Sequence, residues 1–122
     1  MKKSHTIVIA EAGVNHNGSI STAKKMIDVA KEAGADYVKF QTFTANSLVT
    51  KAAQKAPYQI TKKEKNESQF EMLKRLELDE DSHFELFEYC DKKNIKFLST
   101  AFDLNSIDLL EKLKLEVFKI PS

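Results

Sequence analysis

The chain alternates short apolar runs with segments of helical periodicity, and this alternation constrains the fold more than any other feature. The first run, residues 7–10, is apolar and mostly β-branched, which suits a strand covered on both faces. Similar strand-type runs cover residues 35–41, 95–99 and 116–120. Strands and helices in strict alternation form right-handed crossover units with a parallel sheet. The sequence therefore predicts an α/β fold.

Capping residues mark the expected helices. Ser19, Asp79 and Asp103 each precede a helical pattern and carry an oxygen that accepts a backbone N–H of the first turn. A short helix is also expected around residues 70–76, and Gly34 is expected to end the first helix, since glycine adopts the left-handed conformation readily. The apolar face expected for the last helix consists of Leu104, Ile107, Leu110 and Leu113.

Residues 42–67 interrupt the alternation with a polar, lysine-rich passage. It is much longer than the roughly 2–6 residues of an ordinary strand–helix connection. Loops of this kind are often functional. The less charged stretch at residues 56–59 is therefore interpreted either as a cover for a site or as a solvated excursion.

Composition excludes several classes of function. The chain has 19 basic and 18 acidic residues and a formal charge of +1, so no overall field attracts nucleic acid or an anionic membrane. No apolar run approaches the roughly 20 residues of a membrane-spanning helix or resembles a signal peptide, so we expect a cytoplasmic protein. The single cysteine, Cys90, excludes an internal disulfide and is interpreted as a small core residue.

The glycine pattern distinguishes two α/β architectures. Gly13 and Gly18 do not form the GxGxxG spacing of a nucleotide-binding sheet, so a (β/α)₈ barrel is favoured. Four strand–helix units make half of such a barrel, which closes only when its first strand pairs with its last. Because exposed edges of apolar strands favour aggregation, we expect residues 1–122 to be the N-terminal portion of a longer polypeptide.

Polar side chains stand at the end of every predicted strand, where parallel α/β proteins bind ligands. Lysine is rare in apolar strands unless it is paired or faces a ligand, so Lys39 and Lys119 predict a pocket for a small, multiply charged anion. Alternatively, each lysine pairs with Glu11 or lies at the rim, or one forms a Schiff base with a carbonyl substrate. The complete set is Glu11, Lys39, Gln41, Thr100, Lys119 and Ser122.

His16 lies in a polar turn at residues 15–18. No other histidine has a matching position, because His5 is in the N-terminal tail and His83 is on a charged helix. We therefore interpret His16 as a support of the turn and not as a metal ligand.

Several motifs together resemble one family over essentially the whole chain, in the same order and spacing. They are AEAGVNHNG at 10–18, GADYVKFQTF at 34–43, KAPYQ at 55–59, ESQFEMLKRLEL at 67–78, FLSTAFD at 97–103 and FKIPS at 118–122. The chain resembles the N-terminal half of the catalytic barrel of the sialic acid synthase family, which includes legionaminic acid synthases. It departs from many relatives at Ala101, where they have proline.

The resemblance implies a (β/α)₈ barrel that condenses phosphoenolpyruvate with an N-acetylmannosamine-type sugar, releasing a nonulosonic acid and phosphate. It also implies a homodimer, a C-terminal antifreeze-like domain and a divalent metal, Mn²⁺ or Mg²⁺, whose ligands lie outside this chain. Residues 1–122 alone are then expected to be inactive. The alternatives are another phosphoenolpyruvate-condensing or Schiff-base aldolase barrel, and a non-catalytic anion-binding half-barrel.

The resemblance also implies roles for the residues at the strand ends. Lys39 and Lys119 would hold the phosphate and carboxylate of phosphoenolpyruvate. Glu11 and Gln41 would lie on the side of the sugar or a metal-bound water. The residues that would donate hydrogen bonds to the anion are Thr100 and Ser122.

Overall fold

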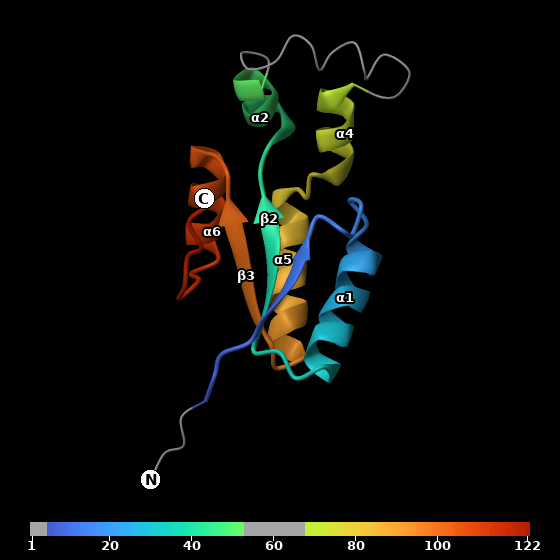
Figure 1. Cartoon of the computed structure of the whole chain (residues 1–122), viewed down its shortest axis with the longest axis vertical. Coiled ribbons are helices and arrows are strands. Elements are labelled where there is room, and N and C mark those ends of the chain that lie inside the picture. The colour runs from blue at the N-terminus through green and yellow to red at the C-terminus, as the bar shows by residue number, and fades with distance from the viewer. Residues whose placement is uncertain (1–4, 53–67) are drawn as a thin grey trace.

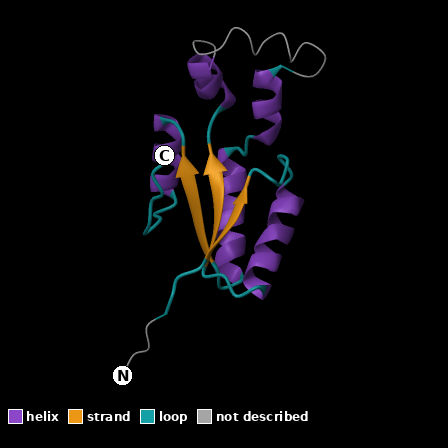
Figure 2. Ribbon diagram, viewed as in Figure 1, coloured by secondary structure: helices purple, strands orange, loops and turns teal. Residues whose placement is uncertain are grey.

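The computed structural model of the chain describes residues 5–52 and 68–122. Its elements, in chain order, are β1 (Ile9–Gly13), α1 (Ile20–Glu32), β2 (Tyr37–Thr42), α2 (Ala45–Ala52), α4 (Gln69–Leu76), α5 (Glu80–Lys92), β3 (Lys96–Ala101) and α6 (Leu104–Lys112). The strands form a parallel sheet in the order β1-β2-β3 (Figures 1 and 2). The predicted α/β class is confirmed.

The predicted caps are confirmed at three helices, and each closes the first turn with a side-chain oxygen. The helix α1 ends before Gly34, whose φ of +89° is the left-handed conformation expected there. The three capping bonds run from Thr22 N–H to Ser19 at 3.2 Å, from Ser82 N–H to Asp79 at 2.7 Å, and from Ser106 N–H to Asp103 at 2.8 Å.

The core lies between one face of the sheet and the helices α1 and α5. Val38 and Phe40 of β2 and Phe97 of β3 are buried there, and the rings of Phe40 and Phe97 stack with centroids 5.6 Å apart. Cys90 of α5 is buried in the same layer, which confirms its assignment to the core. Burial raises the pKa of the Cys90 thiol to about 12, so the thiol is inert at neutral pH.

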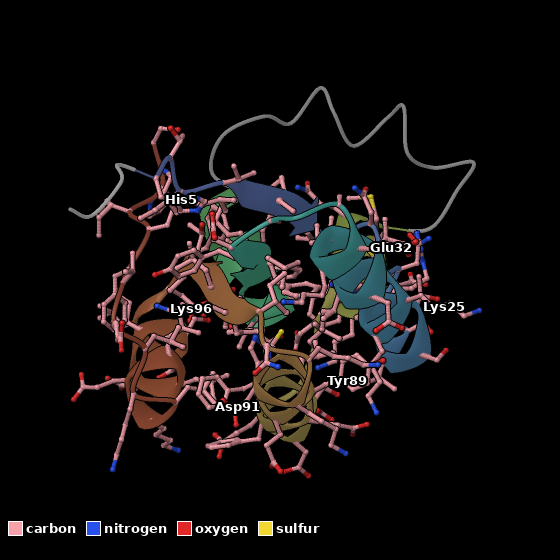
Figure 3. The ribbon with its side chains drawn as sticks, turned by 90° about the horizontal axis from the view of Figure 1, so that it is seen from below. His5, Lys25, Glu32, Tyr89, Asp91 and Lys96 are labelled. Carbon is pink, nitrogen blue, oxygen red and sulfur yellow. The ribbon has the colours of Figure 1, made fainter. Side chains whose placement is uncertain are left out.

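A polar cluster on the outer surface joins α1 to α5. Tyr89, labelled on α5 in Figure 3, donates a 2.7 Å hydrogen bond to Asp28 of α1. Lys24 and Lys93 each lie 5.3 Å from the centre of the Tyr89 ring, a distance that suits cation–π attraction. These contacts hold the two helices together on the side of the sheet away from the strand-end polar groups.

Two predicted strands differ from the structure. The first is observed at Ile9–Gly13 instead of residues 7–10, and Ile7, Val8 and Ile9 are exposed because β1 is an edge strand of the described sheet. The predicted fourth strand, residues 116–120, is reduced to one bridge between Lys119 and Thr100. The apolar side chains of residues 116–120 are exposed, so little burial supports a longer pairing.

Two further expectations were wrong in part. Residues 45–52, expected within a loop, form α2, while the predicted cover at 56–59 lies outside the described residues. On α6, Leu104 and Ile107 are exposed, because the helix packs on the molecule through Leu110 and Leu113 and through the buried Ser106. Periodicity identified this helix but did not show which of its faces packs on the molecule.

Candidate active site

Four of the six candidate residues lie on the sheet face opposite the core helices. The register pairs Glu11 with Lys39 and Gln41 with Thr100. Side chains alternate along a strand, so Lys39 and Gln41 point away from the face that Phe40 buries. The sheet thus places side chains from three strands side by side at the carboxyl ends of the strands.

Lys39, on the central strand, connects the two strands beside it. Its Nζ atom lies 2.7 Å from Glu11 Oε1 on β1 and 3.4 Å from Thr100 Oγ1 on β3. The Lys39 side chain is only 17% exposed, whereas that of Glu11 is 52% exposed. The carboxylate therefore remains largely in water, while the ammonium group is held against the sheet beside a hydroxyl group.

Gly13 lies close against this cluster. It follows an irregularity in the β1–β2 register and has a φ of +57°. A Cβ atom at this position would lie 3.3 Å from Glu11 Oε2 and 3.8 Å from Gln41 Nε2. Sequence reasoning did not assign Gly13 to the site, although a glycine two residues after a strand-end carboxylate is a usable signal.

Lys119 and Ser122 are placed differently from the other four candidates. The backbone of Lys119 bridges to Thr100, but its ammonium group donates to the carbonyl of Ile120 at 2.7 Å. Lys119 and Ser122 are both exposed. The structure brings Glu11, Lys39, Gln41 and Thr100 together, and Lys119 joins them through its backbone. The two-lysine anion pocket stays a prediction.

His16 supports the turn after β1, as predicted. Its Nδ1 accepts the backbone N–H of Gly18 at 2.9 Å, so the neutral ring carries its proton on Nε2. Burial lowers the pKa of His16, and the neighbouring His83 lowers it further. His16 Nε2 is buried and has no hydrogen-bond partner among the residues that the structure describes.

His83 lies on a charged helix, α5, as expected from the sequence, but the sequence did not indicate that its side chain is buried. The residue faces inward from the first turn of α5 and is buried. Its Nε2 lies 2.8 Å from the hydroxyl oxygen of Thr42, which lies 2.6 Å from that of Ser99. The charged neighbours of His83 in the sequence concealed this inward position.

The fold and the candidate site together define a parallel α/β protein with a charged cluster at the carboxyl ends of its strands. The chain belongs to the NeuB family, whose model matches residues 26–122. This confirms the resemblance read from the motifs.

Two relatives support this assignment. The chain is 54% identical over its full length to N,N'-diacetyllegionaminic acid synthase of Campylobacter jejuni. It is 51% identical, over 94% of its length, to the enzyme of the same name from Legionella pneumophila. It covers 36% and 32% of these two proteins, so it spans about a third of the length of the curated relatives it matches.

A solved structure gives the same assignment for the fold. N-acetylneuraminic acid synthetase of Leptospira borgpetersenii, determined in complex with citrate, superposes with a TM-score of 0.76 at 29% identity. The match covers 96% of this chain and 36% of that one. The chain thus corresponds to the N-terminal part of a sialic acid synthase barrel.

Among residues 5–52 and 68–122, no helix is long and apolar enough to cross a membrane. The same residues contain no group of three or more histidine, cysteine, aspartate or glutamate side chains that could hold a metal ion.

Proposed function

We propose that the full-length protein condenses phosphoenolpyruvate with an N-acylated mannosamine-type sugar, giving a nonulosonic acid and phosphate. One observation carries the proposal: Lys39 lies between Glu11 and Thr100 at the strand ends of a NeuB-family chain. The names of the two relatives above 50% identity favour a legionaminic-type product. Residues 1–122 would supply the N-terminal portion of the barrel in a homodimeric enzyme.

The geometry around Lys39 suits the binding of an anion. An ion pair with a half-exposed partner contributes little stability, typically about 0–1 kcal/mol, because water screens it. A multiply charged phosphate ester can therefore replace Glu11 as the partner of Lys39. The hydroxyl of Thr100, 3.4 Å from the ammonium, is in place to donate a further hydrogen bond.

The proposed reaction forms one carbon–carbon bond and one carbon–oxygen bond to water, and it breaks the carbon–oxygen bond to phosphate. C3 of phosphoenolpyruvate attacks the aldehyde carbon of the open-chain sugar, and water adds at C2. The resulting tetrahedral intermediate then expels phosphate by cleavage of its C–O bond. Lys39 and Lys119 would neutralise the anion as its charge shifts, with Ser122 as a second hydroxyl donor. Glu11, once released from Lys39, and Gln41 would orient the sugar or water.

The family resemblance also implies a divalent metal. Among the described residues, no group of three or more histidine, cysteine, aspartate or glutamate side chains could hold one. We propose that its ligands come from outside this chain. Bound there, it would polarise a substrate oxygen or water.

The test measures phosphate release by the full-length protein supplied with Mn²⁺ or Mg²⁺. We expect release from phosphoenolpyruvate only when an N-acylated mannosamine derivative is added. Lys39→Ala should lower the rate at least about a hundredfold, since it removes the charge that faces the leaving phosphate. Lys112→Ala is the matched control, because Lys112 forms a surface ion pair with Glu80 at 3.2 Å.

Two outcomes would contradict the proposal. One is an absence of sugar-dependent phosphate release with every hexosamine derivative tried. The other is trapping of a lysine adduct by borohydride, which would assign the protein to the Schiff-base aldolases instead. Binding of phosphoenolpyruvate without turnover would favour a non-catalytic anion-binding role.

A further inference from the structure

A second polar layer lies directly behind the candidate site, on the core face of the sheet. Thr42 follows Gln41 on β2, and Ser99 precedes Thr100 on β3. The Thr42 and Ser99 side chains are 2% and 0% exposed. Each of these hydroxyl residues is therefore one peptide unit away from a residue of the site, on the opposite face of the same strand.

Three side chains and a carbonyl form a directional chain of hydrogen bonds in this layer. His83 Nδ1 lies 2.8 Å from the carbonyl oxygen of Asp79, which only accepts, so Nδ1 carries the proton. In the neutral ring Nε2 then accepts the Thr42 hydroxyl at 2.8 Å. Thr42, having donated its proton, accepts the Ser99 hydroxyl at 2.6 Å. These hydrogen bonds join α5 to β2 and β3.

A backbone hydrogen bond also joins the end of β2 to the residue after β3. Phe102 donates its N–H to the carbonyl of Thr42 at 3.0 Å. The same register places Gln41 opposite Thr100. Without the Nε2 acceptor of His83, one of the two buried hydroxyl protons, that of Thr42 or that of Ser99, would lack a partner, which is costly in a buried layer. The strand ends that carry Gln41 and Thr100 would then have to move to recover a hydrogen bond.

We infer that His83 is a positioning residue, which fixes the ends of β2 and β3 so that Gln41 and Thr100 meet the substrate in the correct geometry. This inference rests on the proposed function. His83 does not touch the candidate site itself. It acts through Thr42 and Ser99, from the far side of the sheet.

The inferred role depends on a neutral imidazole, and the surroundings of His83 favour that form. Burial lowers the pKa of His83, although the Asp79 carbonyl and the charges of Asp79 and Glu80 act in the opposite direction. From the β1–α1 turn, the nearby His16 adds a further titratable group. A protonated ring would donate from Nε2 and reverse the hydrogen-bond chain, leaving the Ser99 hydroxyl in need of a new acceptor.

Two substitutions in the full-length enzyme separate positioning from simple packing. His83→Leu removes the acceptor, whereas His83→Gln keeps an amide oxygen that accepts from Thr42 and does not titrate. We expect His83→Leu to lower kcat/KM for phosphoenolpyruvate about tenfold or more in folded protein, since small misplacements are costly in catalysis. We expect His83→Gln to keep kcat/KM within about threefold of the wild-type value. Because glutamine does not titrate, the decline of kcat/KM at acidic pH should be weaker in this variant.

Amide hydrogen exchange gives a second readout that needs no activity. In His83→Leu the peptides covering Tyr37–Thr42 and Lys96–Ala101 should exchange about tenfold faster at their carboxyl ends, and in His83→Gln they should not. His5→Leu is the matched control, because His5 is an exposed histidine that bonds Asp36 at 3.0 Å. It should change neither exchange in these peptides nor kcat/KM.

The outcomes are distinguishable from failure of the proposed function. If the wild-type enzyme shows no sugar-dependent phosphate release, the proposed reaction is wrong, and the exchange data alone decide the role of His83. Folded His83→Leu with wild-type kinetics and wild-type exchange would overturn the inference. If His83→Leu does not fold, Thr42→Val and Thr42→Ser replace it, and wild-type behaviour of Thr42→Val would equally overturn the inference.

Discussion

Gly18 is the residue at which the turn after β1 meets α4. Its φ is +79°, and a Cβ atom at this position would overlap the carbonyl oxygen of Arg75. Glycine is therefore required here for two reasons, the left-handed backbone and the close approach of another helix. The contact holds α4 against the turn that His16 stabilises.

Gly18→Ala should destabilise the protein more than a left-handed backbone alone accounts for. We expect about 1–2 kcal/mol from the backbone and a further amount of about 1–3 kcal/mol from the clash with Arg75. Urea unfolding of the full-length protein measures the sum. Gly34→Ala is the control, since Gly34 has a φ of +89° but no atom within 4 Å of the added Cβ. Equal losses for both variants would contradict the close contact.

Part of the candidate site could be predicted residue by residue from the sequence. Lys39 and Glu11 were identified because charged residues in or after apolar strands need a partner or a ligand, and the structure pairs them. The register then explains why Gln41 and Thr100 accompany them. His83 was missed because burial of one side chain on a charged helix depends on what packs against it.

At the scale of the elements, Asp103 ties α2 to α6. Its Oδ1 accepts the N–H of Ser106 at 2.8 Å and caps α6, while its Oδ2 accepts the N–H of Thr44, just before α2, at 2.9 Å. Glu77, after α4, accepts the N–H of Ala45 at 2.9 Å. The start of α2 is thus fixed by two carboxylates, from the segments beside it in Figure 1.

Asp103→Asn should cost more stability than the same change at Asp79. Asparagine is a good helix cap but has only one side-chain oxygen, so Asp103→Asn keeps one of two bonds. Asp79 bonds Ser82 through its N–H at 2.7 Å and through its hydroxyl, and asparagine can keep both contacts, since a hydroxyl oxygen also accepts from an amide N–H. We expect a difference of about 1 kcal/mol, one hydrogen bond, between the variants in thermal unfolding. An equal or larger loss for Asp79→Asn would contradict a stabilising link from Asp103 to α2.

At the scale of the whole molecule, the two flanks of the sheet are apolar and exposed. Ile7, Val8 and Ile9 are exposed beside β1. On the opposite flank, a cavity of about 920 Å³ lies beside α6, and exposed apolar residues line it. Those apolar residues are Leu104, Ile107, Phe118 and Ile120. In the proposed barrel, the remaining strands would cover both flanks.

Acid should destabilise the whole molecule, because folding lowers the pKa of two histidines and two aspartates. Burial lowers the pKa of His16 and His83 from 6.5, so the unfolded chain binds more protons just below that pH and stability falls on acidification. Backbone N–H groups lower the pKa of Asp36 and Asp79 from 3.8, which adds a second loss below about pH 4.

Urea titrations of the full-length protein at several pH values test this expectation. The free energy of unfolding should be nearly constant between about pH 7 and pH 8 and should decline from about pH 6.5 downward. His83→Gln, which removes one of the two buried titrating rings, should show a shallower decline between pH 6.5 and pH 5. A free energy that stays level or rises over this interval would contradict burial of neutral histidines.

The sequence by itself determined the class, the order of the main elements, the caps and the family. These follow from local periodicity, from capping chemistry and from the spacing of motifs, all of which are properties of neighbouring residues. Only the tertiary structure decided how Lys39 reaches both Glu11 and Thr100, which way α6 is rotated, and that α2 forms. It also decided that His83 is buried behind the strand ends. Burial and register depend on segments that are distant in the chain, and no local pattern contains them.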